Sequence, residues 1–120
     1  MTRSPIDFLR DSVEAMEAAR AFIEGFEYST FAEDEKTNFA VVRALEIAGE
    51  AVKNVPEDVR SRFPKVPWRV MAGLRDVLIH AYFGVNLEVV WKTTTERIPE
   101  VMPLLRDAVE TLEAEGSKED

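Results

Sequence analysis

The residues best suited to chemistry lie between positions 75 and 82, in the stretch RDVLIHAY. His80 is the only histidine of the chain; it stands five residues after Arg75 and two before Tyr82. An imidazole can exchange protons near neutral pH, whereas a guanidinium stays charged and can hold two phosphate oxygens. These residue types point to proton transfer beside a bound phosphate, so this stretch is the first candidate for function.

The spacing of these residues limits how they can meet. At about 100° per residue, a helix puts Arg75 and Tyr82 on nearly one line and His80 roughly 140° round from Arg75. Asp76 and His80 are four residues apart, so the carboxylate could orient the imidazole and favour its charged form. Arg75 and His80 can therefore reach one substrate if the helix ends near His80, which Gly84 would allow, or if a second chain contributes.

The helices that must position these residues can be read from the spacing of apolar residues and from the prolines. This pattern predicts helices over about 5–25, 35–54 and 68–82, a short helical turn over 56–63, and a last helical stretch capped by Asn86. A polar segment around 28–34 is expected to turn the chain, and Pro99 and Pro103 are expected to kink or break the last rod. Because no alternating strand pattern is present, the sequence predicts an all-α, antiparallel bundle of about five helices.

Composition limits the class of protein further. The 120 residues fit one domain, expected over 1–115, followed by a short acidic tail over 116–120 that should fray. No cysteine is present, which excludes disulfides and thiolate metal sites, and the single histidine gives no dedicated metal spacing. No apolar stretch resembles a signal peptide or a membrane span, so a cytoplasmic protein without membrane attachment or cofactor is expected.

The charge is acidic overall but locally basic. The formal net charge is -8, from 15 basic and 23 acidic residues, which argues against indiscriminate coating of nucleic acid. Residues 60–75 nevertheless contain five basic residues and no acidic one. The four that precede Arg75 are candidates for RNA binding, with a solvated surface as the alternative reading: Arg60, Arg62, Lys65 and Arg69. Trp68 and Trp91 are interpreted as core or interface anchors rather than base-stacking platforms.

A family resemblance appears at this point. RDVLIHAY has the form Arg, four residues, His, one residue, Tyr, and it stands with LEIAGEAVKNVP upstream and with PWRVMAGLR and YFGVNLEVVW around it. With these segments, the chain resembles the HepT-like toxins of the HEPN superfamily over roughly residues 34–105. The resemblance implies a HEPN-type helical bundle and a metal-independent endoribonuclease that acts as a homodimer. Arg75 and His80 of both chains would meet at the dimer interface.

The resemblance also implies a partner. Similar toxins are commonly paired with a nucleotidyltransferase antitoxin of the MntA kind, which silences the enzyme by attaching AMP to the motif tyrosine, here Tyr82. The residue after the motif arginine is often asparagine in such proteins. Asp76 keeps a polar group there but brings a negative charge, and it is a candidate for catalytic support or only a helical partner of His80.

The residue chemistry agrees with a dimeric nuclease. RNA cleavage without metal needs a base for the 2′-hydroxyl, an acid for the 5′-leaving oxygen and a cation beside the phosphorus. Arg75 suits the last role, but one imidazole cannot easily be both base and acid in one step. A symmetric dimer would supply two copies of His80. AMP on Tyr82 would add bulk and negative charge that block RNA.

Two other functions remain open from the sequence. The chain could be a catalytically inactive HEPN binding module that docks a nucleotidyltransferase, which the acidic net charge and Asp76 favour. It could also be a purely structural helical dimer, in which His80 is an ordinary buried residue and the polar cluster has no chemical role.

Overall fold

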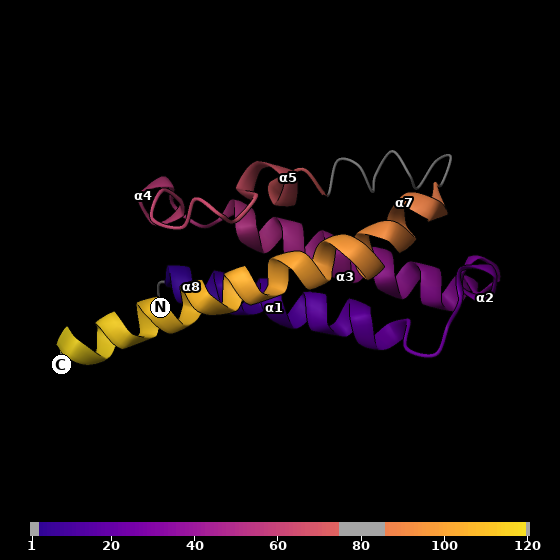
Figure 1. Cartoon of the computed structure of the whole chain (residues 1–120), viewed down its shortest axis with the longest axis horizontal. Helices are drawn as coiled ribbons and strands as arrows, with labels where there is room; N and C mark the ends of the chain where they lie inside the picture. Colours follow the sequence, from indigo (N-terminus) through magenta and orange to yellow (C-terminus); the bar gives the residue numbers. More distant parts are fainter. Residues whose placement is uncertain (1–2, 75–85, 120) are drawn as a thin grey trace.

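The computed structural model describes the backbone of residues 3–74 and 86–119 and the side chains of 3–74 and 86–116. Within these ranges the chain is helical and contains no strand, which confirms the all-α prediction. The helices, labelled as in Figure 1, are α1 (Pro5–Phe22), α2 (Tyr28–Glu33), α3 (Glu35–Lys53), α4 (Glu57–Arg60), α5 (Trp68–Ala72), α7 (Leu87–Lys92), the π-helical segment η1 (Thr93–Arg97) and α8 (Ile98–Glu119).

Helix α1 begins at a capping box. The Ser4 hydroxyl accepts from the Asp7 backbone N–H at 3.3 Å, and the Asp7 carboxylate accepts from the Ser4 backbone N–H at 2.9 Å. Pro5 follows the cap, at a position where its missing N–H costs the helix no hydrogen bond. The predicted start of the first helix is thus confirmed.

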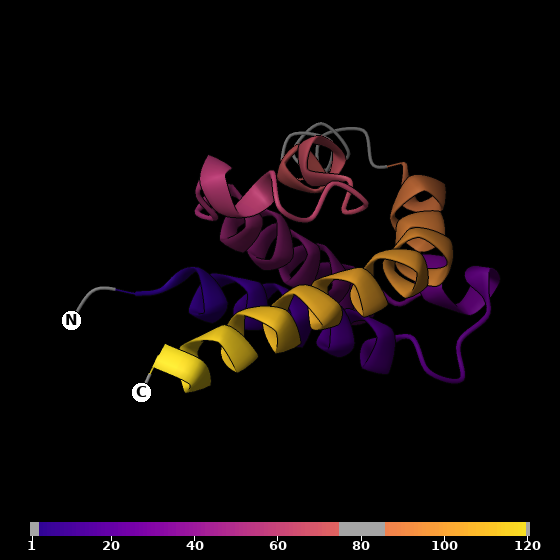
Figure 2. The same ribbon diagram turned by 60° about the vertical axis from the view of Figure 1, so that its left-hand side comes forward.

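The core lies between α1, α3 and α8, and α3 and α8 both run antiparallel to α1 along the long axis (Figures 1 and 2). Each helix contributes a stripe of fully buried residues, including Leu9 and Met16 from α1, Leu45 from α3, and Ile98 and Leu105 from α8. The predicted apolar stripe of the last helix therefore serves packing within the bundle. Ion pairs at the rim, Arg106 with Glu17 at 2.8 Å and Arg10 with Glu113, join α8 to α1.

Helix α2 occupies the segment around 28–34 that the sequence predicts to turn the chain, and the chain does reverse its direction between α1 and α3 (Figure 1). Thr30 caps the helix from inside, since its hydroxyl accepts from the Glu27 N–H at 3.0 Å. Phe31 is fully buried, and its ring lies 5.2 Å from that of Trp91 on α7. The six residues of α2 become helical because the Phe31 side chain anchors them to α7, which is far away in the sequence. The polar composition of the segment does not reveal this contact.

The prolines act differently from one another. In η1, the Ile98 N–H donates to the Thr93 carbonyl, five residues earlier, as in a π-helix. The same spacing would pair the Thr94 carbonyl with the N–H of residue 99, but residue 99 is proline and has no N–H. Arg20 of α1 donates to the Thr94 carbonyl instead, at 3.4 Å. Pro103, by contrast, lies inside α8, which continues past it. The expected irregularity is therefore found before Pro99, whereas at Pro103, where a kink or a break is expected, the helix is not broken.

The end of the chain continues α8 as far as Glu119. The start of α1 and the end of α8 lie toward the same end of the molecule (Figures 1 and 2). The division into a domain over 1–115 and a fraying tail over 116–120 stays a prediction. No helix in the described part of the chain is both long and apolar enough to cross a bilayer.

The capping box leads to a prediction about pH. The Ser4 backbone N–H, and less strongly the Ser4 hydroxyl and Arg3, hold the pKa of Asp7 below its ordinary value of 3.8. Because the folded-state pKa is depressed, the stabilisation is complete above that ordinary value and is lost as the pH falls through the lower folded-state pKa. We expect Asp7→Asn to lower the free energy of unfolding at pH 7, and the difference from the unchanged protein to vanish in strong acid.

Urea unfolding followed by circular dichroism at several pH values measures this difference. Glu110→Gln, at an exposed position of α8, is the control and should change little. An Asp7→Asn protein as stable as the unchanged chain at pH 7 would contradict the role of the cap.

Candidate active site and its basic flank

The motif residues Arg75, Asp76, His80 and Tyr82 fall within 75–85, outside the described residues. The roles predicted for these four residues therefore stay predictions. The structure does describe the two segments from which this stretch departs and to which it returns, α5 and α7.

The entry segment is anchored to the body of the protein. The Trp68 indole N–H donates to the Phe63 carbonyl at 3.0 Å, which fixes the start of α5. Met71 is fully buried and Leu74 is 6% exposed, so the last described residue before the motif lies in the core. Helix α5 packs on α3, as Figure 1 shows. The chain therefore enters the motif from a fixed position.

The exit segment is anchored as well. The Asn86 side chain accepts from the Val89 N–H at 3.3 Å, which confirms Asn86 as the predicted cap of α7. Val90 is fully buried, and the Trp91 ring contacts Phe31 and, at 6.2 Å between ring centres, Tyr28. The prediction that Trp91 is a packing anchor is confirmed. Both described segments that flank the motif are thus held to the body of the protein.

Arg60 is held by backbone carbonyls. Its Nε donates to the Val55 carbonyl at 2.8 Å, and its Nη2 donates to the carbonyls of Val52 and Lys53 at 3.1 Å each. These carbonyls lie at and just beyond the end of α3, where a helix leaves acceptors without partners. Arg60 thus closes the C-terminus of α3, and most of its donors are occupied by this role.

Arg62 forms an ion pair with Glu115 near the end of α8. The hydrogen bond to Glu115, together with the charge of that carboxylate, raises the pKa of Arg62 above its ordinary value. Its guanidinium also lies over the Phe63 ring, 5.6 Å from the ring centre. The side chain is 44% exposed, so it can still contribute charge at the surface, but its position is set by α8.

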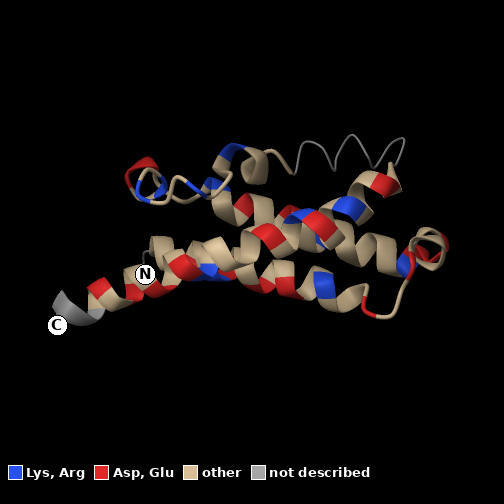
Figure 3. Cartoon of the chain, in the orientation of Figure 1, with Lys and Arg blue, Asp and Glu red and all other residues tan. Residues whose placement is uncertain are grey.

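Lys65 and Arg69 are different, because both are exposed and neither has a hydrogen-bond or ion-pair partner among the residues that the structure describes. Figure 3 shows basic residues without acidic ones over 61–74, whereas acidic residues are spread along α1, α3 and α8. The four RNA-binding candidates are therefore not equivalent: two have structural partners and two have none within the described ranges.

A surface hollow of about 470 Å³ lies between α4 and α5. The ring of Trp68 and the side chains of Arg60 and Arg69 line it, and Glu57 is the one acidic residue of its lining. Trp68 is predicted from the sequence to be a core or interface anchor rather than a base-stacking platform, and the structure places it both against the core and in the lining of this hollow. Only the arrangement of the two short helices reveals a hollow beside it.

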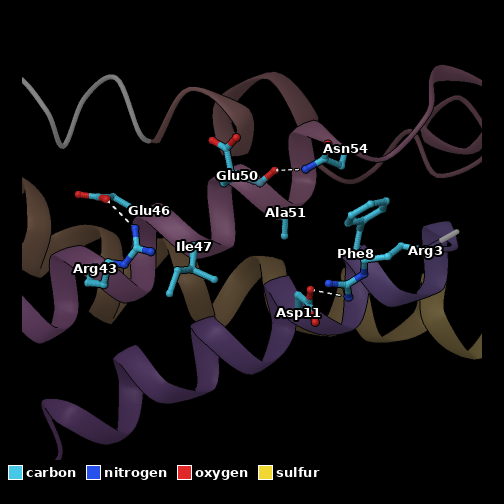
Figure 4. A pocket seen from close by; sticks show the side chains of 9 residues that line it. All are labelled: Arg3, Phe8, Asp11, Arg43, Glu46, Ile47, Glu50, Ala51 and Asn54. Atoms are coloured by element: carbon cyan, nitrogen blue, oxygen red, sulfur yellow. Dashed lines mark hydrogen bonds and ion pairs between the residues drawn. The ribbon is translucent and has the colours of Figure 1, made fainter. Parts of the chain in front are cut away.

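A second surface feature lies on the opposite side of the α1–α3 pair from α8. A pocket of about 450 Å³ lies near the start of α1 (Figure 4). Its apolar lining residues are Phe8, Ile47 and Ala51. Its lining also contains two ion pairs, Arg3 with Asp11 at 2.6 Å and Arg43 with Glu46 at 3.2 Å. An adjoining hollow of about 440 Å³ shares Asp11, Arg43 and Ile47 and continues along apolar residues to Phe22. We call these two hollows together the α1–α3 groove. Phe22 and Ile47 are 43% and 40% exposed, which is unusual for such apolar side chains.

In the described ranges, no group of three or more histidine, aspartate or glutamate side chains is placed to hold a metal ion.

Comparison with known proteins identifies the family. The model of the family described as "Ribonuclease HepT-like" matches residues 13–108. A protein of Thermococcus cleftensis named "Probable ribonuclease HepT" is 52% identical over 99 residues, which cover 82% of this chain and 90% of the relative. No solved structure matches the chain.

Other relatives carry similar names. "Putative RNase MJ0127" of Methanocaldococcus jannaschii is 42% identical over 108 residues, covering 90% of this chain and 89% of the relative. "Putative RNase TTE0752" of Caldanaerobacter subterraneus is 38% identical over 108 residues, covering 90% of this chain and 96% of the relative. The family match covers both anchored segments and the motif between them. The chain therefore belongs to the HepT-like ribonuclease family.

Proposed function

We propose that this protein is the toxin of a cytoplasmic toxin–antitoxin system, a metal-independent endoribonuclease that acts as a homodimer and is silenced when a nucleotidyltransferase antitoxin attaches AMP to Tyr82. One observation carries the proposal: Arg75, His80 and Tyr82 stand at the motif spacing inside the region that matches the ribonuclease family.

The proposed reaction uses side chains alone. His80 of one copy takes the proton of the 2′-hydroxyl, and the 2′-oxygen attacks the phosphorus. The bond to the 5′-oxygen breaks, and that oxygen receives a proton from His80 of the second copy, which acts as acid. Arg75 holds the phosphate oxygens on which negative charge builds up. Asp76 would orient the imidazole, and no metal or organic cofactor takes part.

The anchored ends of the motif stretch support this assignment. Catalysis requires that the reacting groups are held in place before substrate binds, because a misplacement of about 1 Å can cost roughly a hundredfold in rate. Leu74 is buried on the entry side, and Asn86 caps α7 on the exit side. A stretch bounded in this way suits residues that must meet a substrate in a fixed geometry.

Single substitutions test the nuclease. We expect Arg75→Ala and His80→Ala each to lower RNA cleavage by roughly 10² to 10⁴, because each removes a group that acts only on the reacting phosphodiester. Cleavage of total RNA is measured by gel electrophoresis in the presence of a chelator.

Arg97→Ala, an exposed arginine of η1, is the matched control and should cleave normally. Unchanged cleavage by both motif variants would refute the assignment, and cleavage abolished by the chelator would refute metal independence. If the unchanged, unmodified protein cleaves no RNA but still binds its nucleotidyltransferase, the inactive docking module, which the net charge of -8 favours, replaces the nuclease.

The α1–α3 groove supports the homodimer. An isologous interface needs a patch that complements itself. The groove combines apolar residues with acidic ones on α1, Asp11 and Glu14, and with the basic Arg43 on α3. A second copy related by a two-fold axis could place its Arg43 opposite Glu14 while Phe22 and Ile47 of both copies become buried. We therefore assign part of the contact between copies to this groove; the proposed reaction requires the interface to extend as far as His80 of both copies.

We expect Ile47→Glu to convert a dimer into a monomer, because it puts a charge in the middle of the apolar contact. Size-exclusion chromatography with light scattering measures the mass directly. Val89→Glu, at another exposed apolar position, on α7, is the control and should leave the dimer intact. A dimer that survives Ile47→Glu would place the interface elsewhere.

The modification of Tyr82 has its own test. When the protein is expressed together with the nucleotidyltransferase, we expect its intact mass to rise by whole AMP units and its RNA cleavage to stop. Tyr82→Phe removes the accepting hydroxyl and should show no shift. A Tyr82→Phe protein that is still silenced by the active antitoxin would show that this hydroxyl is not the switch.

A further inference from the structure

The hollow between α4 and α5 has the chemical character of a nucleotide site. Its volume of about 470 Å³ lies in the range of small-ligand pockets. Its lining combines an aromatic ring, Trp68, with two guanidinium groups, those of Arg60 and Arg69. A flat apolar surface beside positive charge is the combination on which proteins bind the bases and phosphates of single-stranded nucleic acid.

Trp68 is suited to act as a stacking platform because its ring is fixed. The indole N–H donates to the Phe63 carbonyl at 3.0 Å, and the side chain is only partly buried against the core. A ring held in this way loses little conformational freedom when a base is placed on it. Its anchoring role and a binding role are therefore compatible.

The charged residues around the Trp68 ring have different expected roles in binding. Arg60 is fixed by three carbonyls, so it contributes positive charge to the hollow but has few donors left for a ligand. Arg69 is exposed, has no partner in the described part of the chain, and can hold a phosphate with two parallel hydrogen bonds. The carboxylate of Glu57, which also lines the hollow, repels an anion, so we expect the phosphate to bind at Arg69 and not beside Glu57.

We propose that this hollow binds one nucleotide of a single-stranded RNA substrate, with its base on Trp68 and the adjoining phosphate on Arg69. The inference rests on the proposed ribonuclease function and specifies its substrate: a base can reach the ring only when it is unpaired and unstacked. Arg69 precedes the motif arginine, Arg75, by six residues in the sequence.

The protein offers a direct probe, because it contains only two tryptophans. Trp91→Phe leaves Trp68 as the single fluorescent indole. The ligand is a short single-stranded oligonucleotide with 2′-O-methyl groups, which cannot be cleaved by attack of a 2′-hydroxyl. We expect it to quench Trp68 in a saturable way, whereas the same sequence as a duplex and AMP alone should quench weakly at equal concentration.

Variants separate a binding role from a structural one. Arg69→Gln should weaken oligonucleotide binding and reduce the slope of log K against log salt concentration by about 0.7, the value for one phosphate contact on a single strand. Trp68→Ala should weaken the binding of a labelled oligonucleotide roughly tenfold, and Trp68→Phe should restore most of it. Arg97→Gln is the matched control and should change neither affinity nor slope.

The outcomes are distinct from those of the nuclease test. Quenching that responds to Arg69→Gln supports the site even if ordinary RNA is never cleaved, in which case the proposed function fails and the site stands. Cleavage of RNA without quenching, or with an unchanged salt slope in Arg69→Gln, overturns the site and leaves the nuclease. Equal quenching by AMP or by the duplex also overturns it, because the hollow would then not be specific for a single strand.

Discussion

The packing of α1 against α3 is the interaction on which the rest of the structure depends. Leu9, Met16 and Leu45 are completely buried along this seam, and the hydroxyl of buried Ser12 donates to the Ala48 carbonyl at 3.0 Å. Apolar burial supplies the stabilisation, whereas the single hydrogen bond satisfies a polar group that would be costly to bury alone. Helix α8 packs on α1, and helices α5 and α7 both contact α3, so the two segments that bound the motif take their positions from this pair.

The basic stretch illustrates how tertiary contacts change the meaning of charge. Arg60 closes the end of α3, and Arg62 reaches across to Glu115 on α8. Both arginines fasten the short α4 region, which has little apolar surface of its own, to longer helices. Lys65 and Arg69 are exposed and have no side-chain partner in the described part of the chain. A protein with a net charge of -8 can thus still offer a small basic surface.

The match to the HepT-like ribonuclease family includes the motif stretch and the two helices that flank it, α5 and α7. The motif stretch leaves a buried residue, Leu74, and returns at the capped start of α7. The π-helical segment η1 connects α7 to α8, and Arg20 of α1 donates to the Thr94 carbonyl within it. The open α1–α3 groove lies along the same pair of helices, lined by residues of both.

The sequence by itself determined the helical class, the starts of α1 and α7, the extent of α3, and the residues that carry the family motif. These features are local, because caps, apolar periodicity and motif spacing each depend on residues that are close together in the sequence. The tertiary structure alone decided that Phe31 makes α2 helical, that Pro103 is tolerated inside α8, and that Arg60 and Arg62 have structural partners. It also decided that Trp68 lines a hollow. Each of these depends on residues far apart in the chain that folding brings into contact, and no local pattern records such contacts.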